Sequence, residues 1–122
     1  MEHAPFWIGT ALFSFFVVRM ILSARSRISG KSAREKVAAG AQLVDVRSES
    51  EFRGGAIPGA RNIPVQSLSR RLGELDRQKP IVVYCASGMR SGVAASLLRK
   101  EGYRVANLGA FTRWGQAGLP VK

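Results

Sequence analysis

Cys85, the one cysteine of the chain, is the residue whose surroundings most clearly predict chemistry. It follows a short β-branched run, residues 81–84, that is typical of a buried strand, and the residues after position 91 have helical apolar spacing. A cysteine at such a junction lies near backbone N–H groups and the positive end of a helix dipole, which favour a thiolate or a bound anion. Arg90 adds a full positive charge at the rim of the loop. The pattern predicts a nucleophile.

A buried structural cysteine is the competing interpretation, because most lone cysteines of intracellular domains are of that kind. Such a cysteine needs neither the turn Ser87-Gly88 nor an arginine five residues on, and Gly88 permits the positive φ that lets loop amides converge. The sole histidine is His3, so a Cys–His pair is not expected. One cysteine also excludes an internal disulfide and a Cys-x-x-Cys metal or redox site, and we expect neither metal nor cofactor.

The loop resembles the active-site loop of rhodanese-like sulfurtransferases, whose pattern is Cys, two residues, Gly, one residue, Arg, Ser. Further blocks in the same order resemble the family over roughly residues 32–122: residues 43–47, 56–64 and 108–121. Two positions depart from the family pattern, Ala56 in place of a usual His and Ala110 in place of a usual second Gly. The resemblance implies that Cys85 is catalytic and that the substrate is bound by the rest of the loop: Ala86, Ser87, Gly88, Met89, Arg90 and Ser91.

The resemblance also implies a reaction. Cys85 would take a sulfane sulfur from a small anionic donor such as thiosulfate, hold it as a persulfide, and pass it to cyanide or a thiol, including a protein thiol. A phosphatase or arsenate reductase of the same fold is one alternative, although those enzymes use a longer loop than residues 86–89 provide between Cys85 and Arg90. A noncatalytic binding module is the other, although such modules usually lose the cysteine that this chain keeps.

The order of the remaining patterns predicts an α/β fold. Capping boxes at Ser32–Glu35 and Ser48–Glu51 predict two helix starts, the first helix ending near Gly40. The other expected elements are strands 42–46, 61–63, 81–84 and 104–108, a helix carrying Leu68, Leu72 and Leu75, and a helix over 91–101. Such alternation predicts a parallel sheet with helices on both faces and ligands at the carboxyl ends of the strands, where Cys85 lies. We interpret Asp45 and Arg47 as a structural pair near this edge.

Residues 1–31 are a different kind of sequence, which predicts a membrane anchor and a basic linker ahead of a domain over residues 32–122. Residues 4–18 carry no charge, and the stretch 4–22 would give about 28 Å of helix, close to the ~30 Å hydrocarbon core. The positive charges follow this stretch, which favours an uncleaved single-pass helix with the catalytic domain in the cytoplasm. A short buried helix of a soluble fold is the alternative.

The formal net charge of +11 is high for 122 residues. The basic residues are spread over predicted helices and loops without interleaved aromatic residues, so a nucleic-acid partner is not expected. Attraction to anionic lipids or to small anionic substrates accounts for the charge as well.

Overall fold

A four-stranded parallel sheet forms the centre of the molecule in the computed structural model, which describes residues 11–18 and 26–116. The strand order is β2-β1-β3-β4. The strands are β1 (Gln42–Asp45), β2 (Arg61–Asn62), β3 (Ile81–Cys85) and β4 (Val105–Ala110). The prediction of a parallel α/β sheet is confirmed.

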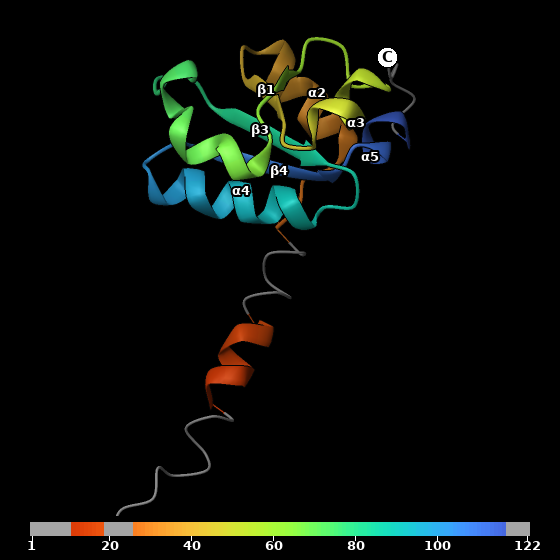
Figure 1. Ribbon diagram of the computed structural model, residues 1–122. Coiled ribbons are helices and arrows are strands. Elements are labelled where there is room, and N and C mark those ends of the chain that lie inside the picture. Colours follow the sequence, from red (N-terminus) through yellow and green to blue (C-terminus); the bar gives the residue numbers. More distant parts are fainter. Residues whose placement is uncertain (1–10, 19–25, 117–122) are drawn as a thin grey trace, which may run out of the picture.

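Helices cover both faces of this sheet, as the sequence predicts. They are α2 (Gly30–Ala38), α3 (Glu49–Arg53), α4 (Met89–Lys100) and α5 (Thr112–Gln116), with two 3₁₀ turns, η1 (Val65–Arg70) and η2 (Leu72–Glu74). Figure 1 shows α4 on one side of the sheet and α2 on the other. The chain therefore runs alternately through strand and covering element, which brings the carboxyl ends of all four strands to one edge.

Strand β3 is buried along its whole length, which explains its β-branched composition. Its side chains alternate between two apolar clusters. Val83 and Cys85 belong to the cluster under α4, together with Leu98, whereas Val82 and Tyr84 belong to the cluster under α2 and α5. Cys85 is thus held at the end of the most buried strand.

Two helix predictions need correction. The first helix begins at Gly30 rather than at the Ser32 box, because Ser29 has extended backbone angles and its Oγ accepts a hydrogen bond from the Ser32 amide at 3.0 Å. The leucine-rich segment forms η1 and η2 instead of one helix. Gly73, a poor helix former, lies in this segment, yet Leu68 remains fully buried.

The second capping box is confirmed. The Ser48 side chain accepts a hydrogen bond from the Glu51 amide, and the Glu51 carboxylate accepts one from the Ser48 amide. The helix after Cys85 begins at Met89, two residues before the expected start, with Gly88 as its N-cap. The strand that follows it, β4, extends two residues beyond the expected end.

The expected anchor is described only in part. Residues 11–18 form a helical stretch whose apolar side chains are exposed, among them Leu12, Phe13, Phe16 and Val18. Within the ranges 11–18 and 26–116, no helix has the length and apolar character needed to cross a bilayer. Residues 4–10 and 19–22 of the expected anchor lie outside the described residues.

Candidate active site

Cys85 lies at the carboxyl end of β3, between the ends of β1 and β4. Its neighbour Tyr84 is in register with Asp45 of β1, and Cys85 itself is in register with Ala110 of β4. The Cys85 carbonyl accepts a hydrogen bond from the Phe111 amide at 2.8 Å, and the whole residue is buried. The position of the sulfur is therefore fixed by the two central strands and the chain that leaves β4.

Two backbone amides hold the sulfur. The Gly88 amide donates to Sγ of Cys85 at 3.0 Å, and the Ser91 amide donates to it at 3.3 Å. Ser91 is the third residue of α4, whose N-cap Gly88 has no side chain, so the cysteine sulfur takes the place that an N-cap oxygen fills in other helices. Negative charge on this sulfur would be stabilised by both N–H groups and by the helix dipole.

Gly88 has a positive φ of 102°, which turns the loop so that its amide faces the sulfur. Ser91 adds a hydroxyl on the other side. The Cys85 thiol donates to Ser91 Oγ at 3.5 Å, and this Oγ donates to the Gly88 carbonyl at 3.2 Å. When the thiol is ionised, the hydroxyl can turn and donate to the sulfur instead.

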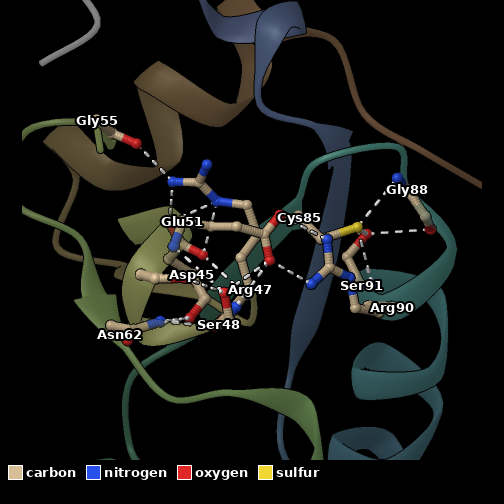
Figure 2. A network of polar contacts seen from close by, with 11 residues as sticks. Asp45, Arg47, Ser48, Glu51, Gly55, Asn62, Cys85, Gly88, Arg90 and Ser91 are labelled. Carbon is tan, nitrogen blue, oxygen red and sulfur yellow. Dashed lines mark hydrogen bonds and ion pairs between the residues drawn. The ribbon is translucent and has the colours of Figure 1, made fainter. Parts of the chain in front are cut away.

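Arg90 reaches across from α4 to Glu51 of α3 (Figure 2). Its two terminal nitrogens donate to the two carboxylate oxygens of Glu51 at 2.7 and 3.0 Å. The hydrogen bond from Arg90, and then that from the Ser48 amide, lowers the pKa of Glu51 to about 2. Arg90 thus lies beside the loop as expected, and the structure adds a partner for it, because the Glu51 carboxylate offsets its charge.

A second arginine–carboxylate pair lies at the same edge of the sheet, as the sequence predicts. Arg47 donates to Asp45 with both its Nε and a terminal nitrogen, the shortest distance being 2.7 Å. It also donates to the Gly55 carbonyl at 2.7 Å and lies 4.4 Å from the centre of the Phe111 ring. The predicted pairing is confirmed, and its nearly complete burial agrees with a structural role.

The predicted site residues are brought together by one loop, but they do not contribute equally. Gly88 and Ser91 contact the sulfur, whereas Ser87 and Met89 are exposed, Met89 by 73%. Ala86 is half-buried. The second departure from the family pattern, Ala110, is the last residue of β4 and lies beside Cys85. The residue before it, Gly109, has a positive φ where the register between β3 and β4 shifts.

Glu51 is a residue that the sequence analysis did not connect with the candidate site. The capping box assigned its side chain to the Ser48 amide alone, although the same carboxylate also binds Arg90. Topology was the signal that could have found it. In a parallel sheet the loops after β1 and β3 leave from the same edge, so residues just after Arg47 had to lie beside the Cys85 loop.

The chemistry open to this arrangement is nucleophilic. Within the described part of the chain, no group of three or more His, Cys, Asp or Glu side chains could hold a metal ion. A cysteine sulfur held by amides can attack a soft electrophile and keep the product atom in the same set of hydrogen bonds.

Comparison with known proteins fits this geometry. Residues 29–117 match the family described as Rhodanese-like domain. The chain belongs to this family. It is also 44% identical over 111 residues to the uncharacterized protein YqhL of Bacillus subtilis, an alignment that covers 85% of this chain and 88% of that protein.

Two further relatives carry the name of an activity. Thiosulfate sulfurtransferase GlpE of Shewanella oneidensis is 37% identical over 78 residues, which cover 62% of this chain and 77% of that protein. The structure of the human single-domain sulfurtransferase TSTD1 is similar with a TM-score of 0.63 at 34% identity, covering 75% of this chain and 96% of that one. At the level of the family, these relatives support sulfur transfer.

Proposed function

We infer that this protein is a sulfurtransferase that moves a sulfane sulfur from a small anionic donor such as thiosulfate to a thiophilic acceptor. The observation that carries this proposal is the pair of amide hydrogen bonds, from Gly88 and Ser91, to the sulfur of Cys85. Activation of the sulfur by backbone amides and a helix dipole needs no histidine, which agrees with a sequence whose one histidine is His3. The rhodanese-like relatives support the same reaction class.

In the first step, the Cys85 thiolate attacks the outer sulfur of thiosulfate. The new bond joins Sγ to that sulfur, the S–S bond of thiosulfate breaks, and its electron pair leaves with sulfite. The product is a persulfide anion on Cys85. Its negative charge is then on the outer sulfur, which the short loop of residues 86–91 can surround with N–H groups.

In the second step, the acceptor attacks the outer sulfur of the persulfide. Cyanide would leave as thiocyanate, and a thiolate would leave as a persulfide. In both cases the electron pair of the broken S–S bond returns to Sγ and restores the Cys85 thiolate, which the Gly88 and Ser91 amides again stabilise. We place a thiol of a small molecule or of a partner protein in the acceptor role.

Formation of thiocyanate from thiosulfate and cyanide tests this proposal. We expect the wild-type protein to turn over and Cys85→Ser to be inactive, because the chain has one cysteine and no other thiol can replace it. If Cys85→Ser unfolds at the same temperature as the wild-type protein, the loss of activity is due to the missing thiol and not to a loss of the fold. A parallel assay with p-nitrophenyl phosphate and arsenate tests the alternative activities, and turnover in that assay alone would contradict the sulfurtransferase proposal.

We also propose that residues 4–22 anchor the protein in a membrane, with the catalytic domain in the cytoplasm. The support is the uncharged sequence of residues 4–18, the exposed apolar side chains between residues 11 and 18, and the positive charges that follow. We expect the full chain to stay in the membrane fraction after carbonate treatment. A thiol reagent that cannot cross membranes should label Cys85 only after permeabilisation; release by carbonate would contradict the anchor, and labelling in intact cells would contradict the orientation.

A further inference from the structure

The side chain of Arg27 packs on the loop that holds the sulfur. If Gly88 had a Cβ atom, it would lie 2.6 Å from Cζ of Arg27 and 2.7 and 2.8 Å from the two terminal nitrogens. A Cβ on Gly109 would lie 2.8 Å from Cδ of the same arginine. The guanidinium therefore fills the space that the absence of a side chain at Gly88 leaves. The same Gly88 donates its amide to Cys85 Sγ at 3.0 Å.

Backbone contacts fix this arginine beside the site. The amide of the next residue, Ile28, donates to the Asn107 carbonyl of β4 at 2.9 Å. The Ile28 carbonyl accepts a hydrogen bond from Arg113 of α5 at 2.8 Å, and the Ile28 side chain packs on the core cluster under α2. The segment that carries Arg27 is thus attached to the sheet by both its backbone and its side chains.

The two arginines near the loop differ in their partners. Arg90 has both of its terminal nitrogens on the Glu51 carboxylate. Nε of Arg27, by contrast, is buried and has no hydrogen-bond partner among the residues that the structure describes, nor does Arg27 form an ion pair with any of them. Buried N–H donors nearly always have an acceptor in the working protein. Arg27 is therefore an arginine that packs on the sulfur loop without a carboxylate partner among residues 26–116.

We propose that Arg27 is the residue that attracts and binds the anionic end of the sulfur donor, the group that carries the oxygens in thiosulfate or an organic thiosulfonate. The identity of the donor rests on the proposed function. The attraction of an anion by the Arg27 charge does not depend on it. Arg90, neutralised by Glu51, holds the loop against α3 instead. A negatively charged ligand at the loop would then contact both the backbone amides around the sulfur and the guanidinium of Arg27.

Alkylation of Cys85 by two reagents of similar size tests the proposal without any sulfur transfer. Iodoacetate is an anion and iodoacetamide is neutral, and both modify the one thiol of the chain. Both need the same access to the buried sulfur, so the ratio of their second-order rate constants reports the local charge. We expect Arg27→Met to lower this ratio by about 5- to 10-fold, as loss of a nearby positive charge at the screening of bulk water predicts. Arg27→Lys should keep the ratio within about twofold of wild type.

Lys100→Met is the matched control, because it removes the same charge from the far end of α4, about 16 Å of helix from Met89. It should leave the ratio unchanged. In the thiosulfate reaction, Arg27→Met should raise KM more than it lowers kcat. If Arg27→Met slows both alkylating reagents equally, and Arg27→Lys does the same, Arg27 only packs on the loop and the proposal is wrong. A changed ratio in a protein without sulfurtransferase activity would overturn the proposed donor while keeping an anion site at Arg27.

Discussion

Two arginine–carboxylate pairs lie at the same edge of the sheet (Figure 2), and they differ in burial. The side chains of Arg47 and Asp45 are 5% and 0% exposed, whereas those of Arg90 and Glu51 are 37% and 35% exposed. Arg47 also binds a backbone carbonyl and packs on an aromatic ring. A buried pair with satisfied hydrogen bonds holds structure, while a half-exposed pair next to a reactive sulfur can open and close at modest cost. We therefore expect the first pair to contribute mainly to stability and the second to act mainly on the loop that holds the sulfur.

The largest expected effect is the difference in the free energy of unfolding that is lost when each of the two pairs is broken. Asp45→Asn leaves the buried Arg47 without its counter-charge, and we expect a loss of about 3–5 kcal/mol in the free energy of unfolding. Glu51→Gln makes the same chemical change in the half-exposed pair and keeps a residue type suited to the capping box, so we expect about 1 kcal/mol or less. Urea unfolding measures both. Equal losses in the two variants would show that burial does not distinguish the pairs.

The second prediction concerns activity. Arg90→Ala frees the loop from α3 and removes a charge-assisted contact worth ~1.5–3 kcal/mol, which corresponds to roughly a 10- to 150-fold loss in kcat/KM for thiosulfate. Arg53→Ala is the matched control, because Arg53 is an exposed arginine of α3 whose ion pair with Glu49 is long, at 3.8 Å. It should stay near wild-type activity. If Arg90→Ala is as active as this control, the Arg90–Glu51 pair does not contribute to activity.

The third prediction tests the hydroxyl beside the sulfur. Ser91→Ala removes a neutral hydrogen-bonding group worth about 0.5–1.5 kcal/mol, so we expect a roughly 2- to 12-fold loss in the rate of Cys85 alkylation by iodoacetamide. Ser96→Ala changes an exposed serine of the same helix and should have no effect. If both variants react at the wild-type rate, the two amides alone stabilise the reactive sulfur.

The smallest expected effect is a pH dependence. The hydrogen bonds from Arg90 and then from the Ser48 amide lower the pKa of Glu51 from 4.5 to about 2 in the folded protein. The ionised carboxylate therefore stabilises the fold fully above pH 4.5, and this contribution is lost as the pH falls toward 2. The stability difference between wild type and Glu51→Gln should therefore be constant from pH 5 to 8 and shrink between about pH 4.5 and 2. Urea unfolding at pH 7 and pH 3 measures it. A difference that grows at pH 3 would contradict the assigned pairing.

Local patterns predicted much of this molecule because they depend on neighbours in the sequence. The strand before Cys85, the capping box at Ser48 and the pair at Asp45 and Arg47 each follow from residues a few positions apart. The two-residue turn at Ser87-Gly88 likewise fixes the loop that presents the sulfur. These features could be read from the chain alone.

The partners of Arg90 and the place of Arg27 depend on contacts between distant segments, and local patterns do not contain them. Glu51 and Arg90 are 39 residues apart, and their contact exists because β1 and β3 are neighbours in the sheet. Arg27 was assigned to a linker by its charge pattern, yet the hydrogen bond from Ile28 to β4 brings it to the sulfur loop. Sheet order, rather than periodicity, decides both.

Intact-mass spectrometry after incubation with thiosulfate tests the central claim, a persulfide on Cys85, most directly. The wild-type protein should gain the mass of one sulfur atom, and cyanide should remove it again with release of thiocyanate. Cys85→Ser, which lacks the only thiol of the chain, should gain nothing under the same conditions. A wild-type protein that gains no sulfur, or a Cys85→Ser variant that does, would contradict the account.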